Sequence, residues 1–200
     1  MSRAIFLGSF NPPHIGHRKC IEAVLNSGMM DFCGIDHIHI IPAYQNPNKS
    51  ESLDFWKRYQ MCRYMFSGLS ENVLVDDIEA TIRPKYTYDL ITHFLRGEDK
   101  MIGHKFWWII TEETFLELLD DKWFKSKELL RSNKFLILFD GNDICEAVRY
   151  SNYYYGTLKI QKPVTIHSTK IREMAKSGED VSVYTCKEID NLIKEEKLYR

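Results

Sequence analysis

The segment that most constrains the fold is a ten-residue loop at residues 8–17, with the sequence GSFNPPHIGH. It directly follows a short apolar run at residues 4–7, which predicts a buried strand. It leads into residues 15–27, whose apolar side chains have helical spacing. Strand, tight loop and helix in this order bring backbone N–H groups and a helix N-terminus to one point. The sequence therefore predicts a phosphate site at residues 8–17.

Apolar runs and helical patterns alternate along the rest of the chain. The expected strands cover residues 3–7, 38–41, 73–75, 106–110 and 135–139. The expected helices cover residues 15–27, 55–66, 86–95, 115–130 (one broken helix or two short ones) and 187–199. This alternation predicts an α/β fold, a Rossmann-like doubly wound parallel sheet flanked by helices. Such sheets bind ligands beyond the carboxyl ends of their strands, where residues 8–17 fall.

Composition indicates a single globular domain over residues 1–200. Of the 200 residues, 44% are hydrophobic and 28% are charged. The formal net charge of -1 gives no support for a nucleic-acid or membrane partner, and no apolar run has the length of a membrane span. Five scattered cysteines without a C-x-x-C pair indicate free thiols, so we expect a cytoplasmic protein. The tyrosine-rich run at residues 150–155 is a candidate contact surface for a homo-oligomer.

The two histidines of the loop suit one kind of chemistry. Displacing pyrophosphate from a nucleoside triphosphate needs aligned oxygens and neutralised charge rather than covalent help from the protein. His14 and His17 can donate hydrogen bonds and carry charge near neutral pH. We expect Gly8 to let the main chain approach a phosphate and Gly16 to keep the helix start open. No metal ligands are predicted, because no Cys, Asp or Glu lies near the two histidines to complete a site.

Two motifs carry a family resemblance. Residues 8–17 resemble the G-x-F-N/D-P-x-H-x-G-H signature of HxGH-motif nucleotidyltransferases. Residues 165–172 (TIHSTKIR) resemble the I-S-S-T-x-I-R element of nicotinate/nicotinamide mononucleotide adenylyltransferases, with His167 in place of the first serine. We expect Ser168 or Thr169 to N-cap a helix whose N-terminus, together with Arg172, cradles the leaving phosphates. The part of the domain from about residue 163 to 200 would then carry this second phosphate-binding motif.

The resemblance implies an adenylyltransferase that joins AMP from ATP to nicotinamide or nicotinate mononucleotide, in NAD biosynthesis or salvage. It implies catalytic roles for His14, His17, Lys49 and Arg172. It implies that ATP and its phosphates are bound by Gly8, Ser9, Phe10, Gly16, His167, Ser168 and Thr169. It implies that the mononucleotide is bound by Asn11, Tyr86, Thr87 and Trp123. Mg²⁺ is expected as a cofactor carried mainly by the ATP phosphates. The family's R-x-x-M helix is similar to residues 58–61, which implies that Arg58 supports the loop bearing Lys49.

Two segments depart from the family pattern. Residues 111–113 (TEE) replace G-x-D, and residues 139–141 (FDG) replace a segment with an arginine. These changes keep the adenylyl-transfer residues but leave the acceptor open. One alternative is a sibling nucleotidyltransferase that acts on phosphopantetheine or another phosphorylated acceptor. The other is a non-catalytic nucleotide-binding sensor of the same fold.

Several other polar and aromatic residues are interpreted as structural. We expect a solvated acidic turn at residues 76–79, which contains two aspartates and Glu79. We expect His37 and His39, which alternate on one face of a strand, to have structural roles. Residues 107–108, two tryptophans in a strand, are expected in the core.

Overall fold

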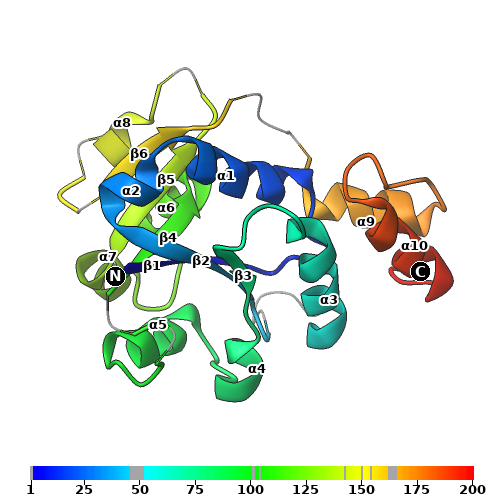
Figure 1. Cartoon of the computed structure of the whole chain (residues 1–200), viewed down its shortest axis with the longest axis horizontal. Coiled ribbons are helices and arrows are strands. Elements are labelled where there is room, and N and C mark those ends of the chain that lie inside the picture. The colour runs from blue at the N-terminus through cyan, green and yellow to red at the C-terminus, as the bar shows by residue number, and fades with distance from the viewer. Residues whose placement is uncertain are drawn as a thin grey trace.

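The computed structural model describes residues 2–45, 52–100, 102–103, 105–141, 143–149, 151–153, 155–161 and 166–200. Within them, six strands form one sheet in which every neighbouring pair is parallel, in the order β3-β2-β1-β4-β5-β6 (Figure 1). The strands are β1 (Ser2–Gly8), β2 (Ile35–Pro42), β3 (Val73–Val75), β4 (Phe106–Thr111), β5 (Lys134–Phe139) and β6 (Tyr155–Lys159). The predicted doubly wound α/β fold is confirmed.

Helices cover both faces of the sheet. The first face is covered by α1 (Ile15–Asn26) and α3 (Phe55–Phe66), and α9 (Ser168–Lys176) and α10 (Lys187–Glu195) join the same apolar cluster. The second face is covered by α5 (Thr87–Leu95), α6 (Glu112–Leu119), α7 (Ser126–Ser132) and α8 (Glu146–Arg149). Two short helices, α2 (Met29–Cys33) and α4 (Ile78–Ile82), lie in the connections. Figure 1 shows α9 and α10 beside the start of α1 and beside α3.

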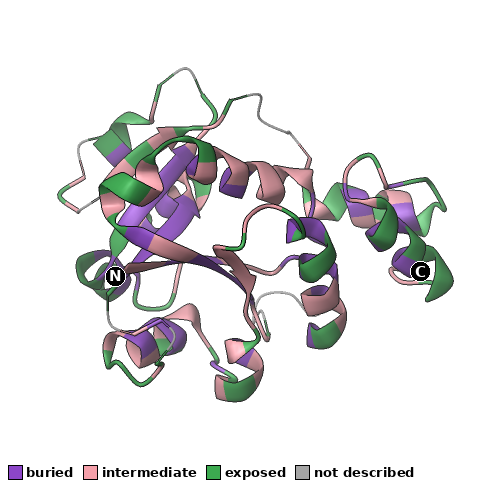
Figure 2. Ribbon diagram, in the orientation of Figure 1, coloured by how far each residue is buried: buried purple, intermediate pink, exposed green. Residues whose placement is uncertain are grey.

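The alternation of side chains along each strand divides the core into two apolar clusters. In β1, Ala4 and Phe6 join the cluster of the first face, while Ile5 joins that of the second. In β4, Trp107 lies on the first face and Trp108 on the second, and both are buried. Figure 2 shows the resulting buried strands between partly exposed helices. Both tryptophans are therefore core residues, as expected.

The strand order fixes where a ligand can bind. Strand β1 lies between β2 and β4, and the helices that follow β1 and β4 pack on opposite faces. The two connections therefore diverge at the carboxyl ends of these strands, the point where sheets of this kind bind their ligands. Residues 8–17 follow β1 at this point, and Thr111 ends β4 beside it.

Some elements differ from the sequence prediction. Short elements of four or five residues, α2, α4, α8 and β6, were not predicted, because so few residues show no clear periodicity. The last helix ends at Glu195 rather than at residue 199. Beyond it, Lys197 (φ 54°) and Tyr199 (φ 68°) have left-handed backbone conformations that cannot continue a right-handed helix.

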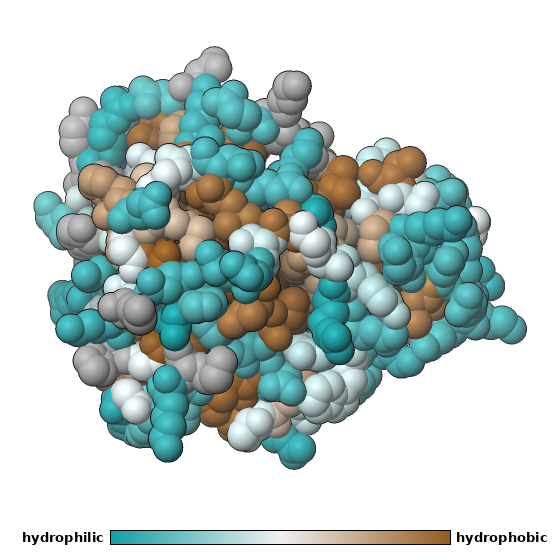
Figure 3. Space-filling model, viewed as in Figure 1, coloured by the Kyte–Doolittle hydropathy of each residue, from teal (hydrophilic) through white to brown (hydrophobic). Residues whose placement is uncertain are grey.

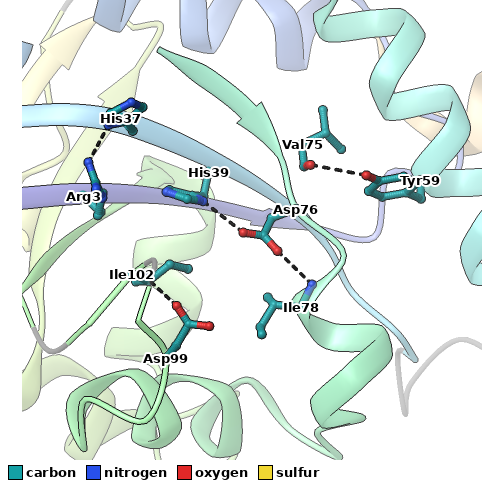
Figure 4. A network of polar contacts seen from close by, with 9 residues as sticks. All are labelled: Arg3, His37, His39, Tyr59, Val75, Asp76, Ile78, Asp99 and Ile102. Carbon is teal, nitrogen blue, oxygen red and sulfur yellow. Dashed lines mark hydrogen bonds and ion pairs between the residues drawn. The ribbon is translucent and has the colours of Figure 1, made fainter. Parts of the chain in front are cut away.

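The two histidines of β2 hold structural contacts, as predicted (Figure 4). The guanidinium of Arg3 in β1 hydrogen-bonds Nδ1 of His37. The buried His39 pairs through Nδ1 with the Asp76 carboxylate at 3.0 Å, and the other Asp76 oxygen accepts from the backbone N–H of Ile78 at 2.9 Å. Asp76 therefore starts α4 and ties it to β2. The expectation of a solvated turn holds for Asp77, which is exposed, and is wrong for Asp76.

The surface is mainly hydrophilic around the last two helices, as Figure 3 shows for the face in view. Helix α10 turns Ile189, Leu192 and Ile193 toward the core, and its polar side chains other than the buried Asp190 face outward. No helix among the described residues has the length and apolar character needed to cross a membrane. All five cysteines are free thiols, as expected.

Candidate active site

The start of α1 is built from two histidines that cap it reciprocally. His14 is the N-cap residue, and its Nδ1 accepts a hydrogen bond from the backbone N–H of Gly16 at 3.1 Å. Nδ1 of His17 accepts from the backbone N–H of His14, also at 3.1 Å. Because each Nδ1 accepts, the neutral form of each ring carries its proton on Nε2. The capping geometry therefore gives both imidazoles an Nε2–H donor.

The two rings are close together and uncharged near neutral pH. Their centroids are 3.8 Å apart. Burial, followed by the charge of nearby His167, lowers the pKa of His14 to about 4. Burial, followed by the charges of His14 and His167, also holds the pKa of His17 well below its usual range. The expectation of charged imidazoles is therefore wrong for the ligand-free protein. A bound anion would raise both pKa values.

Gly8, at the end of β1, and Phe10, in the loop after it, pack against each other. A Cβ added at Gly8 would lie 2.9 Å from the Phe10 ring, so glycine is required by that ring. Phe10 is buried and has a strained left-handed φ of 45°. Its ring meets the His17 imidazole edge-on, with centroids 5.0 Å apart. The loop conformation therefore packs Phe10 beneath Gly8 and against His17, which fixes the orientation of the imidazole.

The second motif contacts the loop of the first directly. The Ser168 hydroxyl donates to the carbonyl oxygen of Pro12 at 2.8 Å. Arg172 Nη1 donates to the carbonyl oxygen of Asn11 at 2.9 Å, and Nη2 donates to Thr169 Oγ1 at 3.2 Å. Segments more than 150 residues apart in sequence thus meet at one point.

The cap of α9 differs from the prediction. The helix begins at Ser168, and the N-cap residue is His167, whose side chain makes no capping hydrogen bond. The Ser168 hydroxyl donates to the Pro12 carbonyl and does not cap the helix. The Thr169 hydroxyl oxygen accepts a hydrogen bond from Arg172. The first backbone N–H groups of α9 have no partner within the helix and carry the positive end of its dipole. His167 is exposed beside them and close enough to His14 and His17 to lower their pKa values.

Arg58 connects the loop after β1 with the segment after β2. Its side chain is 2% exposed, and its three donor nitrogens each reach a backbone carbonyl. These carbonyls belong to Ser9 (2.8 Å), Tyr44 (3.0 Å) and Leu53 (2.9 Å). Tyr44 and Leu53 flank residues 46–51, which lie outside the described residues together with Lys49. Arg58 therefore supports both ends of the segment that carries Lys49, in agreement with the expectation.

Glu79 is the second buried charged group in this region, and the expectation that it is solvated is wrong. Its carboxylate accepts from the backbone N–H of Tyr44 at 2.5 Å. Burial raises its pKa to about 7, while the Tyr44 hydrogen bond and the Arg58 charge act in the opposite direction. Tyr44 is thus held at its N–H by Glu79 and at its carbonyl by Arg58.

The raised pKa of Glu79 predicts a pH-dependent stability. Between its ordinary value of 4.5 and about 7, folded Glu79 keeps a proton that the unfolded chain releases. The free energy of unfolding should therefore fall as pH rises through this interval, by about 1–3 kcal/mol from this group. In urea unfolding, the free energy of unfolding of the parent protein relative to that of Glu79→Gln should therefore fall by this amount between pH 5 and pH 8. The lowered pKa values of His14 and His17 act in the opposite direction in both proteins and cancel in the comparison. Equal pH dependence in both proteins would contradict the assignment.

The residues expected to bind the mononucleotide fall into two groups. Asn11 lies in the loop after β1, where its Oδ1 accepts from the Leu53 N–H at 3.4 Å. The others lie near the second face of the sheet. Tyr86 is the N-cap residue of α5, directly before Thr87, and its ring stacks on Phe124 with centroids 4.4 Å apart. The indole of Trp123 donates to the Glu117 carboxylate at 2.9 Å and is partly buried.

The segments that depart from the family pattern make contacts within the fold. The Thr111 hydroxyl caps α6 by accepting from the backbone N–H of Thr114 at 3.4 Å. Glu112 accepts from the backbone N–H of Cys145 at 2.5 Å, which joins α6 to the segment after β5. The carboxylate of Asp140 lies near enough to the buried Cys20 thiol to help burial raise its pKa.

One contact at this site had no signal in the sequence. The Tyr199 hydroxyl donates to Asn11 Oδ1 at 3.0 Å, across 188 positions of sequence. Tyr199 follows a helical pattern and was interpreted as the end of that helix, so its position depends on the irregular backbone after Glu195. Glu79 was likewise missed because a single glutamate in an acidic turn is usually solvated.

The comparison with known families agrees with this geometry. Residues 5–174 match the family model described as cytidylyltransferase-like, and the match includes both loops of the site. The fold and the site thus define a nucleotidyltransferase. A curated relative from Fusobacterium nucleatum, "Probable nicotinate-nucleotide adenylyltransferase", is 32% identical over 203 residues, and the alignment covers 98% of each of the two chains. A relative of the same description from Caldicellulosiruptor bescii is 26% identical over 210 residues, with full coverage of both chains. The chain belongs to the nicotinate-nucleotide adenylyltransferase family.

Solved structures show the same fold. The nicotinic acid mononucleotide adenylyltransferase of Plasmodium falciparum complexed with NaAD matches with a TM-score of 0.81 at 19% identity. The match covers 99% of this chain and 97% of the other. The complex of that protein with APC matches with a TM-score of 0.79, at 19% identity, and covers 99% and 96% of the two chains.

Proposed function

We propose that the protein transfers AMP from ATP to nicotinate mononucleotide and releases pyrophosphate. The observation that carries the proposal is the contact between the two motifs, in which Ser168 and Arg172 bond to the carbonyls of Pro12 and Asn11. This contact puts the N-terminus of α9 beside the two capping histidines, where one triphosphate can reach both. The description shared by the curated relatives supports nicotinate mononucleotide as the acceptor.

The reaction would be a single displacement at the α-phosphorus of ATP. An oxygen of the mononucleotide 5′-phosphate forms the new bond, the bond between the α-phosphorus and its bridging oxygen to the β-phosphate breaks, and pyrophosphate leaves. We assign the Nε2–H groups of His14 and His17 to the oxygens of the α-phosphate. As neutral donors fixed by the backbone, they need no reorganisation while negative charge develops. The backbone N–H of Gly16 donates to Nδ1 of His14 and so helps to hold this imidazole in place.

The leaving phosphates would lie at the N-terminus of α9. The backbone N–H groups of Ser168 and Thr169, the exposed His167 and the guanidinium of Arg172 supply positive charge and donors there. Ser9 and Phe10 would contribute main-chain donors from the loop after β1, with Gly8 providing room for the Phe10 ring that orients it. Lys49 is assigned to the phosphates that flank the reacting centre.

The mononucleotide would lie between the loop after β1 and the aromatic residues of the second face. We assign Asn11 to its phosphate–ribose part and Tyr86, Thr87 and Trp123 to its pyridine ring. An aromatic face can stack on such a ring and attracts a pyridinium cation.

Mg²⁺ would fit this site as a companion of the ATP phosphates. The described part of the chain contains no group of three His, Cys, Asp or Glu side chains that could hold a metal ion. When bound to the triphosphate, the ion would neutralise charge on the phosphate oxygens. We also propose a cytoplasmic location, since all five cysteines are free thiols.

The test is a direct assay with a panel of acceptors. The protein, with MgATP, should release pyrophosphate and form a dinucleotide when given nicotinate mononucleotide. The same assay with nicotinamide mononucleotide, with phosphopantetheine and with CTP in place of ATP should give kcat/KM values at least about tenfold lower, since one unmatched polar group costs about 1–3 kcal/mol. If phosphopantetheine is the one acceptor of the panel that gives turnover, the protein is a sibling nucleotidyltransferase. If ATP binds and no acceptor gives turnover, the protein is a nucleotide-binding sensor.

A further inference from the structure

The terminal segment, residues 196–200, reaches the loop of the active site. The Tyr199 hydroxyl donates to Asn11 Oδ1 at 3.0 Å, and its ring packs against the apolar cluster of the first face. An ion pair of 2.5 Å between Lys57 Nζ in α3 and Glu196 Oε1 holds the start of the segment. This segment is therefore attached to the same helix that carries Arg58.

Two residues of the segment have an unfavourable backbone conformation, and this conformation places the Tyr199 side chain at Asn11. Lys197 and Tyr199, neither of them glycine, have left-handed φ values of 54° and 68°. Such conformations are unfavourable for residues with a Cβ and persist where the surroundings impose them. Here the surroundings include the contact of the Tyr199 ring with the core and its hydrogen bond to Asn11.

Tyr199 acts as a hydrogen-bond donor at neutral pH. Burial raises the pKa of its hydroxyl well above its usual range, although the charges of Arg172 and Arg58 oppose the rise. The hydroxyl therefore keeps its proton. Because both Tyr199 and the Leu53 N–H donate to Asn11 Oδ1, the oxygen side of the Asn11 amide is turned toward them.

Asn11 is the point where three separate segments meet. Arg172 of α9 donates to its carbonyl, while Leu53 of the segment before α3 and Tyr199 donate to its side chain. We propose that Tyr199 is a positioning residue, which fixes the rotamer of Asn11 and so sets the affinity for the mononucleotide. This proposal rests on the proposed function, in which Asn11 contacts that substrate.

The experiment removes one oxygen atom. In Tyr199→Phe, the ring keeps its packing and only the hydrogen bond to Asn11 is lost. We expect the KM for nicotinate mononucleotide to rise roughly 5- to 10-fold, the effect of one hydrogen bond. The KM for ATP, kcat and the melting temperature should remain near those of the parent protein. A matched control is Tyr59→Phe, which loses a hydroxyl contact of 3.5 Å to the Val75 carbonyl and touches no assigned site residue (Figure 4).

A double-mutant cycle shows whether Tyr199 acts through Asn11. Asn11→Ala should itself raise the KM for the mononucleotide, and adding Tyr199→Phe to it should have no further effect. Independent, multiplicative effects would overturn the proposal, as would a Tyr199→Phe variant with unchanged KM. A lower melting temperature with equal loss for both substrates would show a structural role instead. If the parent protein itself neither binds nor adenylylates nicotinate mononucleotide in calorimetry and turnover assays, the proposed function fails, which is a separate outcome.

Discussion

His17→Ala should lower kcat for adenylyl transfer by about 10²–10³-fold, the usual loss when one preorganised donor is removed from a developing oxyanion. The reason lies in the cap of α1. The Nδ1 of His17 is held by the His14 N–H at 3.1 Å, which leaves the Nε2–H as the group available to the α-phosphate. A steady-state pyrophosphate-release assay measures the change. Because the free rings of His14 and His17 have depressed pKa values, the kcat/KM of the parent protein should show no titration of these two histidines between pH 6 and pH 8.

His17→Asn distinguishes loss of the donor from loss of the cap. The asparagine oxygen can still accept from the His14 N–H, while its short amide cannot reach as far as Nε2. We therefore expect a folded protein with a melting temperature close to that of the parent and a low kcat. His93→Ala is the matched control. His93 lies on α5, its Nδ1 is 3.0 Å from Oε2 of Glu98, and it has no assigned role in the reaction. Parent-like turnover in either His17 variant would contradict the mechanism.

The fold could be predicted from the sequence because its signals are local. The apolar runs at residues 4–7, 106–110 and 135–139 are buried strands, and the strand–helix alternation led directly to the parallel sheet. What failed were irregular or very short segments. Helix α4 depends on the pairing of His39 with Asp76, a contact between positions 37 residues apart that no local pattern reports.

The meeting of the two motifs was predictable from the sequence, and the interactions within them were not. The loop of residues 8–17 and the helix with Arg172 do meet, as the two motifs suggested. The sequence could not show that Phe10 fills the space at Gly8, because that depends on a left-handed φ at a non-glycine residue. Nor could it show that burial leaves His14 and His17 neutral, since the pKa of a histidine depends on its surroundings in the folded chain.

Arg58→Met should lower the free energy of unfolding by about 3–5 kcal/mol, the cost of removing one member of a buried charged group. The three carbonyls of Ser9, Tyr44 and Leu53 would lose their donors together in a site that is 2% exposed. Glu79 would lose its nearby positive charge, so its pKa should rise above about 7. Urea unfolding with linear extrapolation measures the change. Arg58→Lys should be destabilising as well, because one ammonium cannot reproduce the fork of three donors.

Arg18→Ala provides the matched control for this effect. Arg18 also donates to two backbone carbonyls, those of Met65 at 2.6 Å and Ser67 at 3.0 Å, but its side chain is 30% exposed. Water can replace it at those carbonyls, so we expect a loss of about 1 kcal/mol. A similar small loss in Arg58→Met would contradict the role of Arg58 as the support of the loop after β1. If the loss is large, the Arg58 variants that remain folded should also have a raised KM for ATP, because both ends of the segment carrying Lys49 are released.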